Sequence, residues 1–540
     1  MKPHHHNRIT AIMLATGLAF FTTAVSAANV PEGTVLADKQ ELIRNNGSEP
    51  ASLDPHKVES DVEFNIISDM FDGLVAVKPD GTIEPRLAAS WENKGNWIFH
   101  LREGITWSDG TPITAQDVVW SWQRLVDPKT ASPYASYLGN MNIVNAADIA
   151  EGKKAPDTLG VKALDDKTLE ITLTQPTAAF LPMLAHPSLV ALDKTLVTRF
   201  AEKWTKPEHF VSSGPYTLSQ WIVNERIVGK RNPRYWDDAH TVINQVTYLP
   251  ISSEAADVNR YRAGEIDITS TVPINQFALL KKTMPEQLNV SPHLATYYYE
   301  LNTTRPPFND ARVRRALNMA LDKEIIAEKV LGQGQRPAWL VSQPEIGGIT
   351  LKNPDYASWP REKRIAEAKK LLAEAGFGDD HPLSFNLLYN TSESHQRIAI
   401  AAASMWKKNL GVEAKLQNQE WKTMLDAKRT GNFDAVRYAW IADYDDATTF
   451  LNNYRTGDSS NTSRYSNPAY DAALLNAAKA PDIAARGRYY QQAEDLLAQD
   501  VPSIPVYHYV RSHLVKPWVG GFTPDRLGYY FTKDMYIKKH

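Results

Sequence analysis

The feature that most restricts the fold of this sequence is an uninterrupted alternation of helix-like and strand-like segments. Apolar residues recur at helical spacing in three stretches: 115–125, 312–331 and 362–375. Short β-like runs lie before, between and after them: 34–37, 96–101, 168–173, 383–388 and 412–416. Such alternation is typical of proteins whose helices pack on sheets. We therefore predict an α/β fold.

Local signals mark where several of these segments begin and end. Thr114 precedes the first helical stretch and Asp310 the second, and both residue types favour the N-cap position. Gly376 follows the third stretch, where a C-cap glycine is expected. Asp-Gly pairs at 80–81 and 109–110 predict tight turns.

The domain organisation follows from length and from what the sequence lacks. A chain of 540 residues is long enough for about two or three domains with substantial cores. We find no internal repeat, no low-complexity tract and no Gly/Ser-rich linker. The domains are therefore expected to be joined by several crossings of the chain.

The first 27 residues have the pattern of a secretory signal. Lys2 and Arg8 supply positive charge, the stretch 9–25 is largely apolar, and small residues end at Ala27. A membrane anchor is the alternative, but threonines interrupt this stretch and a cleavage pattern follows it. No later stretch reaches about 18 uninterrupted apolar residues. We predict signal peptide cleavage near Ala27, export to the periplasm and no membrane anchor.

Composition excludes further classes of protein. The absence of cysteine rules out a disulfide framework and a lipid-modified cysteine. The chain has 59 Lys and Arg against 62 Asp and Glu, a mild acid excess that does not suggest nucleic acid as a partner. Its 14 Trp and 23 Tyr suit a polar pocket lined with aromatic rings, although a large aromatic core is the competing interpretation.

A series of motifs runs along the chain in order. They are FHLREG (99–104), WSDGTPITAQDV (107–118), SGPY (213–216), NPRYW (232–236), YRAGEID (261–267) and FNDARVR (308–314), followed by NTS (390–392) and VKPW (515–518). Together they resemble the dipeptide and oligopeptide solute-binding family of ABC importers. The resemblance covers essentially the whole chain after the predicted signal. The signature formed by 99–104 and 107–118 predicts a strand, a tight turn and a capped helix, which points to a structural role.

This resemblance implies three α/β domains that form two lobes, joined by two crossover strands and closing on a ligand cleft by a hinge motion. Lobe one would comprise domain I, residues 28–71, 194–294 and 511–540, together with a satellite domain II at 72–193. Lobe two would be domain III, residues 295–510.

The resemblance also implies a function. A receptor of this family would capture short oligopeptides in the periplasm and deliver them to an ABC permease and ATPase complex, as a monomer and without a cofactor or metal. A receptor for many sequences must contact what all peptides share: the ammonium, the backbone amides and the carboxylate.

Candidate residues for the two charged ends follow from matching positions. Asp443 would meet the ammonium in a charge-assisted hydrogen bond; without the resemblance it would read as a solvated acid in an acidic loop. Arg437 would grip the carboxylate, because a guanidinium can bind it bidentately. His395 and Lys428 would serve peptides of other lengths, although arginine is expected at position 428. A lone histidine such as His395 is otherwise more often structural.

Further positions would line the cleft. Glu59 would favour basic side chains on the peptide. Rings and other contacts match at Tyr134, Tyr298, Asn390, Trp421, Trp440, Ile441 and Tyr509. Core packing competes with these roles, most clearly for Trp421. Ala295 and Ile441 stand where many relatives are expected to carry a cysteine pair, which leaves the rigidity near the hinge in doubt.

Two other classes of function are the alternatives to a receptor for oligopeptides. A periplasmic hydrolase is disfavoured because the sequence has no Gly-x-Ser-x-Gly motif, no His-Glu-x-x-His motif, no Walker loop and no cysteine nucleophile. A receptor of the same family for another ligand, such as murein tripeptide, a nickel complex or haem, is compatible with the same motifs. Glu59 favours the oligopeptide interpretation.

Overall fold

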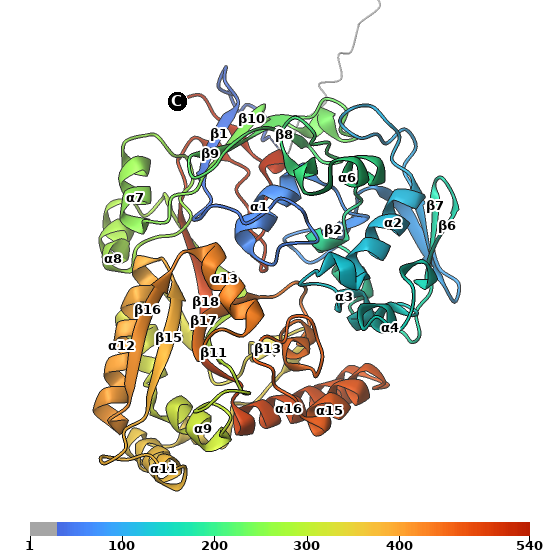
Figure 1. Ribbon diagram of the computed structural model, residues 1–540. Coiled ribbons are helices and arrows are strands. Elements are labelled where there is room, and N and C mark those ends of the chain that lie inside the picture. The colour runs from blue at the N-terminus through green and yellow to red at the C-terminus, as the bar shows by residue number, and fades with distance from the viewer. Residues whose placement is uncertain (1–29) are drawn as a thin grey trace, which may run out of the picture.

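Three sheets organise the part of the chain that the computed structural model describes, residues 30–540 (Figure 1). The first has the order β1 (Glu41–Asn45), β10 (Gln245–Leu249), β9 (Arg226–Arg231), β8 (Tyr216–Ile222). The second has the order β4 (Ala88–Asn93), β5 (Trp97–Leu101), β7 (Thr168–Ile171), β6 (Val161–Asp165). The third has the order β12 (Arg336–Pro337), β18 (Ser503–Leu514), β11 (Leu288–Leu301), β17 (Ala435–Ile441), β15 (Ser384–Asn390), β16 (Glu413–Gln419).

Helices cover these sheets. The main ones are α1 (Asp61–Met70), α2 (Ala115–Val126), α6 (Lys194–Phe200), α7 (Glu254–Arg262), α8 (Ile274–Thr283), α9 (Ala311–Ala320), α11 (Arg361–Glu374), α12 (Glu393–Leu410), α13 (Trp421–Thr430), α15 (Pro468–Ala478) and α16 (Ile483–Asp500). Shorter elements include α3 (Tyr137–Asn140), α4 (Ala146–Ala150), α5 (Phe180–Met183), α10 (Lys323–Ile325), α14 (Thr448–Leu451), β2 (Val75–Val77), β3 (Ile83–Pro85), β13 (Glu345–Ile346), β14 (Ile349–Thr350), β19 (Val519–Gly520) and β20 (Tyr536–Ile537).

The sheets divide between two lobes. We call the part built on the first two sheets lobe one and the part built on the six-stranded sheet lobe two. Figure 1 shows lobe one at the top and lobe two at the bottom. The long strands β11 and β18 pair in antiparallel fashion from Leu288 and Leu514 at one end to Glu300 and Ser503 at the other, and they run between the lobes. The predicted two-lobed α/β fold is confirmed. The domain boundaries themselves stay a prediction, and the predicted signal peptide lies outside the described residues.

The motif at 107–118 folds as its residues predict. Gly110 adopts a φ of +93° in the turn, a conformation that L side chains rarely adopt. Thr114 begins α2 with a capping box, in which its backbone N–H donates to Asp117 Oδ2 at 2.8 Å. The signature is therefore structural, as expected.

The predicted helix over 312–331 is wrong as a single element. Asp310 caps it as expected, but α9 ends at Ala320 and Leu321 is extended. A second helical segment then starts at Lys323, whose buried ammonium donates to Asn318 Oδ1 at 2.7 Å and to the Ala338 carbonyl at 2.9 Å. These tertiary hydrogen bonds hold the backbone in a bend that the apolar periodicity does not predict.

The predicted strand at 34–37 is also wrong. It makes one isolated bridge, between Leu36 and Lys538, and the Ala37 backbone N–H donates to the carbonyl of Ile537 in β20, which is too little pairing for a strand. The aromatic side chains are divided between the core and the cleft, and Trp107, Trp122 and Trp406 are fully buried in the core.

Among residues 30–540, no helix is long and apolar enough to cross a membrane.

Candidate ligand-binding cleft

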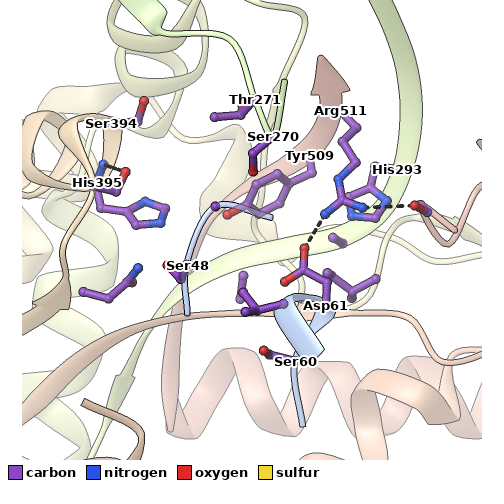
Figure 2. Close-up of a pocket in the computed structure, with 18 of the residues that line it drawn as sticks. Ser48, Ser60, Asp61, Ser270, Thr271, His293, Ser394, His395, Tyr509 and Arg511 are labelled. Atoms are coloured by element: carbon purple, nitrogen blue, oxygen red, sulfur yellow. Dashed lines mark hydrogen bonds and ion pairs between the residues drawn. The ribbon is translucent and has the colours of Figure 1, made fainter. Parts of the chain in front are cut away.

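A cavity of about 280 Å³ lies between the lobes. Lobe one contributes residues 45–48, the start of α1 and the start of α7, while lobe two contributes the start of α12 and the strand β17. Residues of β11 and β18 complete the wall. In Figure 2, Asp61 and Arg511 form an ion pair on one side of this cavity, and Ser394 and His395 lie on the other.

Most of the predicted ligand residues line this cavity. They are Glu59, Tyr134, Asn390, His395, Trp421, Arg437, Trp440, Ile441, Asp443 and Tyr509. Tyr298 and Lys428 do not. Tyr298 packs against Tyr438, and the buried Lys428 ammonium lies 4.0 Å from the centre of the same ring and 3.9 Å from Glu300 Oε2. Their roles as ligand residues stay predictions.

Asp443 lies just beyond the end of β17, at one end of the cavity. The Tyr134 hydroxyl donates to its Oδ1 at 3.1 Å, and Nε2 of His186 lies 3.1 Å from the same oxygen. Its backbone N–H donates to Thr449 Oγ1 at 2.8 Å, which fixes the start of the loop. No Lys or Arg of the described chain lies within ion-pair distance of this carboxylate.

Arg437 lies near the other end of β17. Its Nη1 donates to Asn390 Oδ1 at 3.1 Å and its Nη2 to the Tyr509 hydroxyl at 2.8 Å, while the guanidinium lies 4.7 Å from the centre of the Tyr297 ring. Within residues 30–540 no carboxylate pairs with it. Burial lowers the pKa of the neighbouring His395 well below its ordinary value, and the Arg437 charge lowers it further. His395 is therefore neutral, and Arg437 is the charged group at this end.

Between these two residues β17 has a free edge. On one side β17 pairs with β11 from Ala435 to Ile441. On the other side β15 pairs only with Ala435 and Val436, although all residues from 437 to 443 line the cavity. The backbone facing the cavity therefore has no strand partner over 437–441 in the described chain, and it can pair with an extended ligand.

Aromatic side chains flank this edge. The Trp421 ring stacks on Tyr438, with 6.2 Å between ring centres and 4° between the planes. The indole N–H groups of Trp421 and Trp440 are buried and donate to no described residue. These donors are available to a bound ligand or to water.

The carboxyl groups of Glu59, Glu254 and Asp257 also lie in the cavity wall. Burial raises the pKa of the Asp257 carboxyl to about 7, and it raises the pKa of Glu254 as well. Glu59 Oε1 is buried with no hydrogen-bond partner in the described chain. Sequence reasoning found Glu59 but missed Asp257, Glu254 and His186, because nothing in their local sequence distinguishes them from capping or structural residues.

The two lobes also contact each other directly beside the cavity. Glu254, the first residue of α7, accepts hydrogen bonds from Ser392 Oγ at 2.8 Å and from Oγ and N of Ser394 at 2.5 and 3.2 Å. Glu393, the first residue of α12, accepts from Ser253 Oγ at 3.0 Å and from a backbone N–H in the first turn of α7 at 3.1 Å. Each carboxylate thus caps the opposing helix and stabilises the contact between lobes.

Removing one of these carboxylates is expected to weaken every ligand that needs closed lobes. We predict that Glu254→Ala lowers affinity about tenfold for ligands of all lengths, because it removes charge-assisted hydrogen bonds made only when the lobes meet. Calorimetric titration of the purified protein checks this. Glu265→Ala is the matched control, because Glu265 is exposed and pairs with Arg260 in the same lobe. An equal effect of both variants would contradict the role of the contact.

Comparison with known proteins decides the family. Residues 82–462 match the family described as bacterial extracellular solute-binding proteins, family 5 Middle. The chain belongs to this family. It is 53% identical over 522 residues to the periplasmic oligopeptide-binding protein OppA of Salmonella typhimurium, covering 96% of each chain. The predicted relationship is confirmed.

Two solved structures of family 5 solute-binding proteins bear on the arrangement of the lobes. OppA of Haemophilus influenzae in complex with the peptide RPPGFSPFR is 44% identical to this chain. The match covers 93% of this chain and 100% of that structure's chain, and the two superpose with a TM-score of 0.92. The unliganded open form of the Escherichia coli murein peptide-binding protein MppA is 46% identical over 94% of this chain and 99% of its own, but superposes with a TM-score of 0.65. The lobes therefore stand in the arrangement of the peptide complex.

Ala295 and Ile441 face each other directly in β11 and β17. Positions so placed can carry a cross-strand pair of interacting side chains, and here both members of the pair are apolar. The region beside the cavity is held by strand pairing and side-chain packing.

Proposed function

We propose that this protein is a periplasmic receptor that binds short peptides and delivers them to an ABC permease and ATPase complex. The observation that carries the proposal is the free edge of β17 between an acid and an arginine that lack ionic partners in the described chain. A peptide extended along this edge, with its ammonium at Asp443 and its carboxylate at Arg437, satisfies both charges and its own backbone.

Each remaining candidate residue has a role in this proposal. Ring and hydroxyl contacts come from Trp440, Trp421, Tyr134 and Tyr509. Glu59 favours basic side chains on the peptide. Ile441, Asn390 and the neutral His395 complete the wall. Lys428 and Tyr298 pack against Tyr438, and their predicted contact with the peptide remains part of the proposal.

The cellular setting is part of the proposal. The segment 1–27 directs export and is removed, and the mature protein acts as a monomer in the periplasm. It binds its ligand without chemical change. Its lobes follow the predicted boundaries, with domain I at 28–71, 194–294 and 511–540, domain II at 72–193 and domain III at 295–510.

Peptides are expected to raise the melting temperature of the purified protein by several degrees, because a ligand at about 100 times its Kd stabilises the folded state by about 2.7 kcal/mol. Differential scanning fluorimetry with tri- to pentapeptides, free amino acids and sugars measures this. Free amino acids and sugars serve as controls, since neither spans the two ends. An equal response to all three would contradict a peptide receptor, and a response to murein tripeptide alone would assign the narrower ligand. Intact recovery of the peptides by mass spectrometry would separate binding from hydrolysis.

A further inference from the structure

His186 is a buried side chain of lobe one whose role the proposed peptide contacts leave open. Its ring lies among the rings of Tyr134, Tyr137 and Phe64, with centres 4.4, 5.0 and 5.0 Å away. The side chain is fully enclosed. In such close packing the ring cannot turn freely, so Nε2 is held beside Asp443 as a buried nitrogen with no hydrogen-bond partner among residues 30–540.

The neighbouring backbone fixes the tautomer of this ring. The Ser188 backbone N–H donates to His186 Nδ1 at 3.2 Å, and Ser188 Oγ lies 2.8 Å from the same nitrogen. A backbone N–H can only donate, so Nδ1 must act as the acceptor. The neutral imidazole then carries its proton on Nε2. The group that lies 3.1 Å from Asp443 Oδ1 is therefore an N–H donor.

Two polar groups of lobe one lie beside one oxygen of a lobe-two carboxylate. The Tyr134 hydroxyl donates to Oδ1 of Asp443, and His186 Nε2 lies 3.1 Å from the same oxygen without yet having a hydrogen-bond partner in the described chain. Oδ2 accepts no hydrogen bond from residues 30–540. Tyr134 and His186 lie in segments before β8 and Asp443 lies after β17, so the arrangement exists only when the lobes are closed.

We propose that His186 is a positioning residue for recognition of the peptide ammonium. When the lobes close on a peptide, a small turn of the Asp443 carboxylate lets the unpartnered Nε2–H donate to Oδ1, and this aims Oδ2 at the ammonium. This inference rests on the proposed function, in which Asp443 binds that group. Because the same carboxylate joins the lobes and binds the ligand, closure and ammonium binding stabilise each other.

A double-mutant cycle on the full-length mature protein tests this role. In the parent background, His186→Leu should weaken a free-amino tripeptide about tenfold by calorimetry, the size expected for a hydrogen bond to a charged group. In the Asp443→Asn background the same change should have less than about a threefold effect, because the charged acceptor is gone. His186→Gln should restore most of the affinity, since its amide can donate to Oδ1.

The possible outcomes separate this inference from the proposed function. An equal loss in both backgrounds, or no rescue by glutamine, would mean that His186 only supports packing. No loss of affinity in Asp443→Asn alone would instead remove the proposed ammonium site. The melting temperature of each unliganded variant reports folding. If the leucine variant does not fold, His186→Asn replaces it, because asparagine can accept from Ser188 but is too short to reach Asp443.

Discussion

Replacing Asp443 with asparagine is expected to weaken the binding of free-amino peptides by about 100-fold or more. In the closed cleft the peptide ammonium has no room for a full hydration shell and depends on a fixed anion. Breaking a buried ion pair by removing one partner costs about 3 to 5 kcal/mol, which corresponds to that loss. The unliganded protein should keep its stability, because asparagine has the same shape and can accept from Tyr134.

Calorimetry with a free-amino peptide and its N-acetylated form measures this effect on both proteins. The acetylated peptide has no cation, so it should bind the parent weakly and lose little from the substitution. Asp426→Asn is the matched control, since this acid is exposed on α13, pairs with Arg429 in the same helix and does not line the cavity. A coupling energy indistinguishable from zero would show that Asp443 does not bind the ammonium.

Replacing Arg437 with alanine is expected to give the second large effect, a loss of about 30- to 100-fold for peptides whose carboxylate reaches this position. The guanidinium is already buried and held by Asn390 and Tyr509, so it is oriented before the ligand arrives. Because carboxylates of shorter or longer peptides fall elsewhere along β17, their affinity should decrease less.

A series of tri-, tetra- and pentapeptides, each with a free or an amidated C-terminus, distinguishes this role from a structural one. Amidation should remove most of the difference between the parent and Arg437→Ala. Arg429→Ala is the matched control, because Arg429 is an exposed arginine on α13 that pairs with Asp426 in the same helix. A uniform loss across all lengths and both termini would indicate that Arg437 supports the fold.

Much of the secondary structure could be predicted from local patterns. The helix α2 begins after Thr114 because its capping box lies within four residues of sequence. The strand-like runs at 383–388 and 412–416 became β15 and β16: β15 is buried along most of its length, and β16 alternates between half-buried and exposed residues over most of its length. The prediction of one helix over 312–331 was wrong at Leu321, where the helix stops. Just beyond it, the Lys323 side chain donates a hydrogen bond to the carbonyl of Ala338, 15 residues further along the chain.

The residues of the candidate site could not be predicted from such local patterns. Periodicity and composition do not distinguish Asp443 or Arg437 from other charged residues, and only the resemblance to a family picked them out. It placed ten of the twelve candidates on the cavity wall. It could not decide how a residue packs beside its neighbours: Tyr298 on β11 and Lys428 on α13 both pack against Tyr438 and are not part of the cavity wall.

By itself the sequence determined the α/β class and the family, because caps, turns and motifs are encoded over short stretches of chain. Only the tertiary structure decided which atoms meet across the closed lobes. His186 reaches Asp443, and Glu254 caps the helix that begins at Glu393, through the relative placement of two lobes joined by β11 and β18. Such contacts depend on how whole lobes pack, and no local pattern specifies them.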